Sequence, residues 1–267
     1  MVPTTRRVTS ADGTTLLVEE AGNREAPALV FLHGIAQSRA SFRSVLDGPL
    51  ARDHHLVAFD LRGHGDSDKP GTADAYAGGA RLGEDLAAVL AGLDHPTIIA
   101  WSYGGVVVGE YLRLHGDVGL GAVVFVGAAV KLGKAAKGLL GPTMLENGRG
   151  LVSDDPATYL ATSRTFLEGC LTTPHDVAPL VAEMQRVPTV ARRALLTRTE
   201  DFAPELAASK VPFTTIHGAK DTVILPAMSE AIAAARPATR ATVLANAGHA
   251  PWIDDPPAFE SALRGLR

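Results

Sequence analysis

The stretch Thr97-Ile-Ile-Ala-Trp-Ser-Tyr-Gly-Gly-Val-Val-Val108 decides the fold of this chain. An apolar run leads directly into Ser102, and a helical pattern begins immediately after it. Small residues, Ala100 and Gly104, flank the serine two positions away on either side, as in the tight turn that joins a strand to a helix and presents a nucleophile. Such a turn lifts the hydroxyl above the edge of a sheet in a strained backbone conformation. A glycine-rich turn with an idle serine is the alternative interpretation.

Apolar runs of the same kind recur on both sides of this stretch. Without polar alternation they are typical of strands covered on both faces, as in a parallel sheet. We predict strands at 15–21, 28–32, 54–59, 97–101, 120–126 and 211–216, with a further strand from 241 that ends before His249. Amphipathic segments between them predict helices at 79–92, 103–115 and 226–235. This alternation predicts a doubly wound α/β fold with helices on both faces of the sheet.

The alternation breaks between residues 130 and 210. This stretch shows no clear strand, and its helical segments at 157–168, 175–185 and 189–198 are interrupted by prolines. We therefore predict an α/β core formed by residues 1–129 and 211–267, with residues 130–210 inserted as a helical cap over the site. Ordinary helical packing against the edge of the sheet is the alternative.

A serine nucleophile at such a turn requires an acid and then a histidine, in that order along the chain. Asp221 follows the predicted strand 211–216, and His249 follows the strand that begins at 241. In these roles the histidine would take the serine proton and the aspartate would orient the imidazole. Asp201, Asp254 and Asp255 are rival acids, but none follows a predicted strand in the required order. Asp254 and Asp255 are expected to cap the final helix.

The first apolar strand ends in His33-Gly34-Ile35. Acyl transfer requires two N–H donors directed at a developing oxyanion. We predict that these donors are the backbone N–H groups of Ile35 and Tyr103, with Gly34 allowing a close backbone approach. The first of these residues, His33, is expected to hold the loop rather than to take part in the chemistry.

Composition excludes several other classes of function. The formal net charge is -4, without a basic run, so neither nucleic acid nor a membrane is expected as a partner. The glycine-rich loop 60–68 lacks the spacing of a metal or phosphate site, and we expect neither a metal nor a cofactor. The single cysteine, Cys170, is expected to be a small buried side chain. It cannot form an internal disulfide, and no apolar signal segment follows Met1, so the expected location is the cytoplasm.

Taken together, these motifs resemble those of the α/β-hydrolase superfamily. The matching stretches are His33-Gly34, Asp60-Leu-Arg-Gly-His-Gly-Asp-Ser67, Ala100-Trp-Ser-Tyr-Gly-Gly105, His217-Gly-Ala-Lys-Asp221 and Gly248-His-Ala-Pro-Trp252. The resemblance implies an eight-stranded, mostly parallel sheet with a helical cap after the sixth strand. It also implies Ser102, Asp221 and His249 as a catalytic triad. Haloalkane dehalogenases and epoxide hydrolases of this superfamily carry aspartate at the nucleophile position, and Ser102 argues against both.

The expected function is hydrolysis of small, fairly apolar carboxylic esters through an acyl-enzyme intermediate, without a cofactor. The residues expected to line the substrate pocket, from their position beside the motifs or in the cap, are Trp101, Tyr103, Phe166, Val223 and Trp252; core packing is an equal alternative for each. Three other functions remain open: C–C bond hydrolysis on the same triad, perhydrolase or lactonase activity, and ligand reception without turnover.

Overall fold

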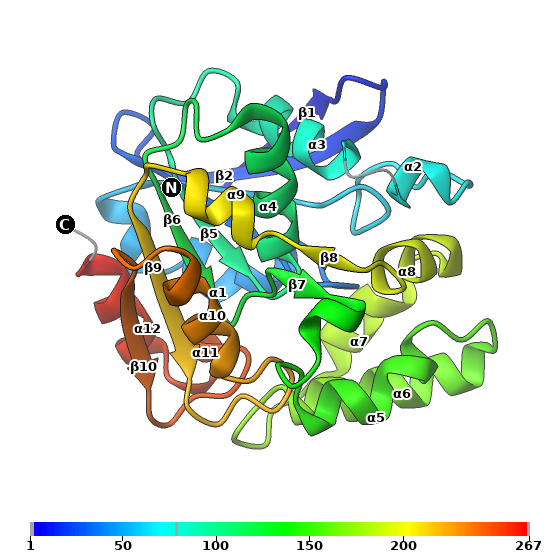
Figure 1. Ribbon diagram of the computed structural model, residues 1–267. Helices are drawn as coiled ribbons and strands as arrows, with labels where there is room; N and C mark the ends of the chain where they lie inside the picture. Colours follow the sequence, from blue (N-terminus) through cyan, green and yellow to red (C-terminus); the bar gives the residue numbers. More distant parts are fainter. Residues whose placement is uncertain (1–2, 78–79, 266–267) are drawn as a thin grey trace.

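The computed structural model describes residues 3–77 and 80–265. Its main feature is one eight-stranded sheet in the order β1-β2-β4-β3-β5-β6-β9-β10 (Figure 1). Six neighbouring strands, from β4 to β10, are parallel, and β1 and β2 extend the sheet in antiparallel pairing. The predicted mostly parallel, eight-stranded sheet is therefore confirmed. Its strands are β1 Thr4–Thr9, β2 Thr15–Gly22, β3 Ala28–Leu32, β4 His55–Phe59, β5 Thr97–Trp101, β6 Ala122–Val126, β9 Phe213–Gly218 and β10 Arg240–Leu244.

Helices cover both faces of this sheet. Side chains alternate along each strand, so the sheet presents two apolar surfaces. On β5, Ile98 and Ala100 belong to the larger core cluster, whereas Ile99 and Trp101 belong to the smaller one. The larger cluster packs against α3 Arg81–Leu90, α4 Gly104–His115 and α10 Ala227–Ala235, and the smaller one against α1 Arg43–Leu46, α11 Pro251–Asp254 and α12 Pro256–Arg264. The remaining short elements of the core are α2 Asp74–Ala77, η1 Arg39–Phe42 and η2 Pro49–Arg52.

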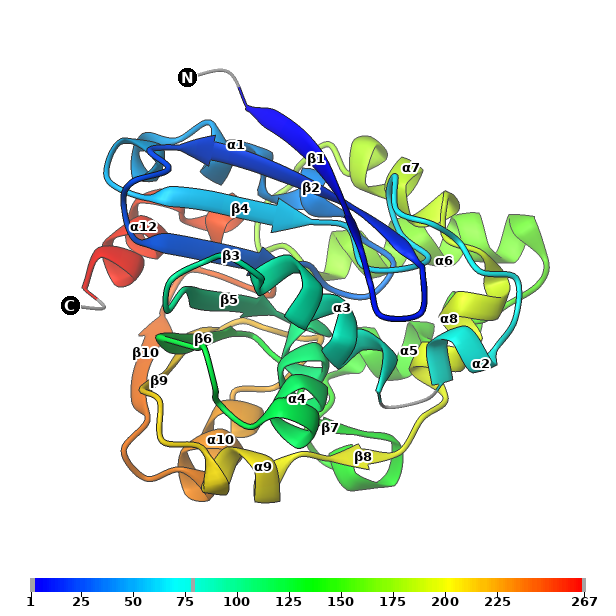
Figure 2. The same ribbon diagram turned by 90° about the horizontal axis from the view of Figure 1, so that it is seen from above.

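A largely helical insertion separates β6 from β9. In Figure 2 its helices α5 to α8 lie beyond the carboxyl ends of β3, β4 and β5. The helices are α5 Pro142–Leu151, α6 Pro156–Gly169, α7 Ala178–Gln185, α8 Thr189–Leu196 and α9 Ala203–Ala208, preceded by η3 Gly133–Ala136. Each prolyl ring at the start of α5, α6 and α7 stands in the first helical turn, where its missing N–H costs nothing. Pro156 and Pro179, two of the prolines that interrupt the sequence pattern, therefore mark helix starts.

The structure corrects the prediction in several places. The insertion contains a two-stranded ribbon, β7 Lys131–Leu132 with β8 Glu200–Asp201, where no strand was expected. The edge strand β1 was not predicted because it is mostly exposed and polar. The predicted helix 79–92 is observed from Arg81, and Gly79 lies outside the described residues. No helix within residues 3–77 and 80–265 has the length and apolar character needed to traverse a lipid bilayer.

Candidate active site

The turn after β5 positions Ser102 at the carboxyl edge of the sheet. Its φ of 53° lies in the left-handed region, which is uncommon for a residue other than glycine. The turn is tight: a Cβ added at Gly104 would lie 2.9 Å from the carbonyl oxygen of Leu32 on the neighbouring strand β3. Along the chain, β3 is followed by β4 on one side of it, and the next strand, β5, lies on its other side. The strand order therefore reverses beside Ser102, which is the usual position of a ligand site in such sheets.

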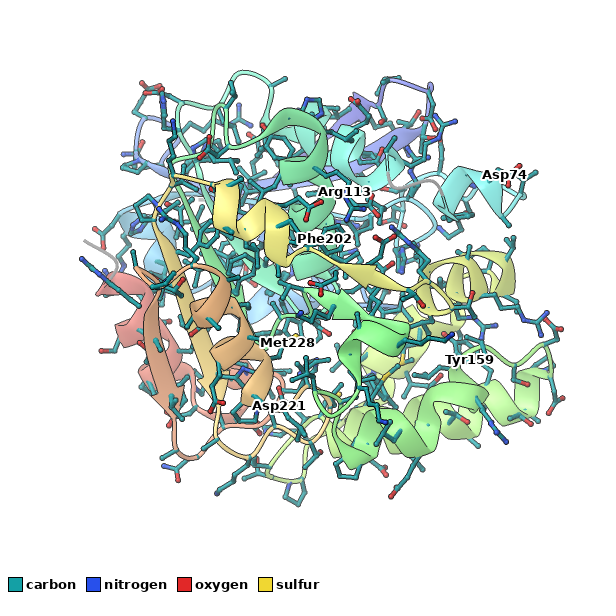
Figure 3. The ribbon with its side chains drawn as sticks, in the orientation of Figure 1. Asp74, Arg113, Tyr159, Phe202, Asp221 and Met228 are labelled. Atoms are coloured by element: carbon teal, nitrogen blue, oxygen red, sulfur yellow. The ribbon has the colours of Figure 1, made fainter. Side chains whose placement is uncertain are left out.

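The structure brings Ser102, His249 and Asp221 into one hydrogen-bonded row. The serine Oγ is 2.9 Å from Nε2 of His249, and Nδ1 of His249 is 2.7 Å from Oδ2 of Asp221. All three side chains are buried. Since the carboxylate accepts a hydrogen bond from Nδ1–H, Nε2 carries no hydrogen and can accept from the serine hydroxyl. Figure 3 shows Asp221 between α10, which carries Met228, and the helices of the insertion.

Three N–H groups donate hydrogen bonds to the Asp221 carboxylate, and the ring of His217 lies beside it. Oδ1 accepts hydrogen bonds from the backbone amides of Val223 and Ile224, at 2.8 and 3.0 Å. Oδ2 faces the imidazoles of both His249 and His217, the latter at 3.3 Å. Burial alone would raise the pKa of this carboxyl, but the two histidines outweigh it and hold the pKa well below its usual range. The aspartate is therefore ionised at neutral pH.

The backbone of His249 is fixed on both sides. Its N–H donates to the carbonyl oxygen of Cys170 at 2.8 Å, and its C=O accepts from the indole Nε1–H of Trp101 at 2.8 Å. Cys170 itself is buried, and burial raises the pKa of its thiol well above the usual value, so it is a packing residue as expected. The histidine is thus anchored by β5 below it and by the insertion beside it.

Gly127 leaves the room that the acid and the histidine need. It follows β6 with a φ of 47°, and a Cβ built there would lie 3.0 Å from Oδ2 of Asp221 and 3.3 Å from Nδ1 of His249. Real Cβ contacts are rarely so short, so a side chain at this position would press on the hydrogen bond between the two residues. Sequence analysis missed this glycine, although its place directly after an apolar strand is a usable signal.

The amides of Ile35 and Tyr103 have no hydrogen-bond acceptor among the residues that the structure describes. The chain approaches the serine closely here, since a Cβ at Gly34 would lie 3.0 Å from that of Ser102. The next amide, Ala36 N–H, is already bonded to Nε2 of His64 at 3.1 Å. Two N–H groups without a partner in the described part of the chain therefore lie on the segments that meet at Ser102, an arrangement that could bind an oxyanion.

His33 holds this loop, as expected. Its Nε2 accepts from the Leu61 amide at 3.0 Å, and its Nδ1 is 2.8 Å from the carbonyl oxygen of Gly34. Both ring nitrogens are thus used by the backbone. Burial lowers the pKa of His33 to about 4, which keeps the ring neutral.

The predicted pocket residues fall into two groups. Trp101 and Trp252 pack edge to face in the smaller core cluster, with ring centroids 4.8 Å apart, and the indole N–H of Trp252 bonds to the Ser41 carbonyl. Phe166 and Val223 are buried in the larger cluster, on the side of the insertion. Their contact with a substrate stays a prediction.

Asp254 does not cap the final helix as expected. Only Asp255 does, by accepting from the Ala258 amide at 3.2 Å. The carboxylate of Asp254 instead binds the amides of Thr172 and Gly248, so it joins the insertion to the loop before His249. Two adjacent acids ahead of a helix look alike in sequence, and only the tertiary contact separates their roles.

Comparison with known proteins identifies the family of the chain. Residues 27–256 match the family model described as the alpha/beta hydrolase fold. The chain belongs to this family. It is 31% identical to the esterase RhEst1 from Rhodococcus sp. ECU1013, with a TM-score of 0.90 over 98% of each chain. It is also 31% identical to a Burkholderia cenocepacia protein assigned as an aryl esterase, with a TM-score of 0.91 over 98% of this chain and 97% of that one.

A relative of similar length is known from sequence. The AB hydrolase superfamily protein YisY from Bacillus subtilis is 23% identical over 270 residues, which cover 96% of both chains. The superfamily suggested by the motifs is therefore the right one. Among the described residues, no cluster of histidine, cysteine and acidic side chains is suited to hold a metal ion.

Proposed function

We propose that this chain is a serine carboxylesterase that cleaves small, fairly apolar esters through an acyl-enzyme. The observation that carries the proposal is the row Ser102–His249–Asp221, with hydrogen bonds of 2.9 and 2.7 Å, beside two backbone amides that have no acceptor within residues 3–77 and 80–265. A buried, ionised acid, an imidazole and a hydroxyl in hydrogen-bond contact are the parts that acyl transfer requires.

In this mechanism Ser102 Oγ attacks the ester carbonyl carbon while its proton passes to Nε2 of His249. The Asp221 carboxylate stabilises the imidazolium through Nδ1–H. The carbonyl oxygen, now an anion, accepts hydrogen bonds from the amides of Ile35 and Tyr103. The imidazolium then protonates the alcohol oxygen as the C–O bond breaks, which leaves the acyl group on the serine. Water, deprotonated by the same histidine, hydrolyses this acyl-enzyme and restores the hydroxyl.

The side chains that share a cluster with Tyr103 are mostly apolar, which favours an apolar acyl group. Buried side chains of the insertion, including Tyr159, Phe166, Met184 and Leu195, share one apolar cluster with Tyr103, the residue after the nucleophile. The Tyr103 hydroxyl donates to the Leu195 carbonyl at 3.1 Å, which ties α8 to the nucleophile turn. We therefore propose that residues 130–210 cap the site. The 31% identity to RhEst1, which is an esterase, supports the same reaction class.

The test is hydrolysis of p-nitrophenyl esters from acetate to octanoate by wild type and by Ser102→Ala. The proposal expects turnover by wild type and a loss on the order of 10³-fold or more without the nucleophile. The chain length with the highest kcat/KM would measure the size of the acyl site. A Ser102→Ala protein that kept more than about a tenth of the activity would contradict the assignment.

A matched pair of variants tests the acid. Asp221→Asn keeps the shape of the side chain but cannot impose the tautomer, so kcat should fall by about 10⁴-fold. The rival Asp201 forms an ion pair with Lys131 on β7, and Asp201→Asn should leave kcat unchanged. Turnover of none of the esters by folded wild type would direct the next assays to diketone substrates of C–C hydrolases.

A further inference from the structure

The insertion is hydrogen-bonded to the loop that carries His249. The segment 170–172 begins where α6 ends. The carbonyl oxygen of Cys170 accepts from the His249 amide at 2.8 Å, and the hydroxyl of Thr172 donates to the carbonyl of Asn246 at 3.0 Å. The position of the histidine backbone therefore depends on residues that lie outside the α/β core.

The Asp254 carboxylate closes this connection. Its Oδ1 accepts from the Thr172 amide at 2.9 Å, and its Oδ2 accepts from the Gly248 amide at 2.7 Å. One carboxylate thus holds the insertion and the residue before His249 at the same time. Hydrogen bonds from amides to an ionised acceptor are about twice as strong as those between neutral groups.

The fit at Gly248 is close. A Cβ added there would lie 2.8 Å from the Cys170 carbonyl oxygen and 3.2 Å from Oδ2 of Asp254. Glycine at this position is what allows the loop to sit against both acceptors. The loop therefore has little freedom to move while the carboxylate is in place.

The element that carries Asp254 is itself anchored. Asp254 is the last residue of α11. Trp252, on the same short helix, packs edge to face against Trp101, with ring centroids 4.8 Å apart. Trp101 in turn bonds to the His249 carbonyl. Supports of this kind are what hold a reactive side chain within about 0.5 Å of its working position.

We propose that Asp254 is a positioning residue for His249, which acts through the amides of Gly248 and Thr172. The inference rests on the proposed function, in which His249 is the base that Ser102 needs. Loss of the carboxylate would release the loop from the insertion and loosen the contacts of the imidazole with both Ser102 and Asp221. A displaced base lowers the rate of the chemical steps without removing substrate contacts.

The experiment compares Asp254→Asn with Asp255→Asn. In the first variant the amide NH₂ replaces one of two accepting oxygens and cannot accept from a backbone N–H. Its neighbour is a matched control, because Asp255 also accepts one backbone N–H but only caps α12. Each protein is assayed with p-nitrophenyl butyrate and with a fluorophosphonate, in which the serine oxygen displaces fluoride from phosphorus.

Asp254→Asn is expected to lower kcat by about 10²-fold, to leave KM within about twofold, and to slow phosphonylation in proportion. Asp255→Asn should leave kcat, KM and the rate of phosphonylation unchanged. Equal rates for Asp254→Asn and wild type, or equal losses in both variants, would overturn the inference.

A second variant guards against loss of folding. Asp254→Glu keeps both oxygens and the charge but moves them by one methylene, so it should react more slowly than wild type even if Asp254→Asn does not fold. A folded Glu variant that reacts at the wild-type rate would also overturn the inference. Failure of wild type itself to be phosphonylated or to cleave any ester would instead overturn the proposed function, and the positioning role with it.

Discussion

The indole Nε1–H of Trp101 lies 2.8 Å from the backbone carbonyl oxygen of His249, 148 residues further along the chain. The residue before Ser102 therefore also supports the backbone of His249. Its ring contributes to the smaller core cluster, and its polar atom has a partner there, as buried indoles usually require. One side chain thus couples the ends of two strands that are not neighbours in the sheet.

Trp101→Phe should lower both stability and rate. It leaves the buried carbonyl of His249 without a donor and removes part of a packed ring, which should cost about 2 kcal/mol of the free energy of unfolding. We also expect kcat to fall about tenfold as the base loses its support. Trp252→Phe is the control, because its indole bonds to the Ser41 carbonyl instead. Equal rate losses in both variants would show that packing alone matters.

Gly127→Ala should impair catalysis far more than it impairs stability. The left-handed backbone costs an alanine about 1–2 kcal/mol. The new methyl group would also press on the bond between Asp221 and His249, so kcat should fall on the order of 10²-fold. Gly138→Ala provides the control: its φ is 80°, and an added Cβ there meets nothing within 4 Å. Chemical denaturation and ester hydrolysis of the two variants separate backbone strain from the contact.

We expect two buried histidines, His33 and His64, to make the protein less stable in acid. Burial lowers the pKa of His33 to about 4 and that of His64 to about 3, below the ordinary value of 6.5 for histidine. The unfolded chain therefore binds more protons than the folded one as the pH falls below 6.5. The contribution of the two neutral rings to the free energy of unfolding is complete above pH 6.5. It is lost as the pH falls toward 4, by about 1.4 kcal/mol per pH unit for each ring.

His64→Gln should flatten this dependence, because it removes one of the titrating groups. The measurement is urea unfolding between pH 7.5 and 4.5. The exposed His175 offers a control, and His175→Gln should retain the wild-type slope. An unchanged slope in His64→Gln would show that its ring is not neutral in the folded state.

The contacts of Arg192 indicate that the shape of its guanidinium, and not its charge alone, helps to hold the insertion together. Its guanidinium donates to the carbonyls of Val187 and Leu151 and to the hydroxyl of Thr189, and it lies 3.4 Å from the ring centroid of Tyr159. The side chain is almost fully buried. These contacts join α8 to the end of α5 and to α6.

Arg192→Lys should therefore lower the free energy of unfolding by about 2 kcal/mol, since a lysine cannot supply the planar set of donors and leaves buried carbonyls unpaired. The neighbouring Arg193 is half exposed and pairs with Asp154 at the surface. Arg193→Lys should change the stability by less than about 0.5 kcal/mol. Similar losses in the two variants would contradict this assignment.

The chain order and local chemistry around Ser102 were enough to predict much of the site. The strand β5 was predicted with its observed limits, because its apolar run is sharply bounded. The structure places Asp221 and His249 beside Ser102 as the motif order suggests, and their catalytic roles await the proposed tests. The positions of Gly34 and Gly104 require glycine, because the backbone passes close to neighbouring atoms there.

Other features depend on contacts that no local pattern encodes. Asp254 and Asp255 precede the same helix, and only the position of residue 172 separates their roles. His217 approaches Asp221 because β9 ends beside it, which no spacing reveals. The helix α5 was missed because its glycines and polar residues weaken the apolar pattern.

The bond between the Cys170 carbonyl and the His249 amide also bears on how such enzymes can be recombined. A chimera that exchanges the whole insertion for that of a relative would also replace residues 170–172. Those residues hydrogen-bond to the loop that carries His249 and to Asp254, so the exchange would remove part of the support of that loop. A chimera built on this chain should therefore keep residues 170–172. The part of the insertion that can be exchanged is then shorter than the extent of its helices suggests.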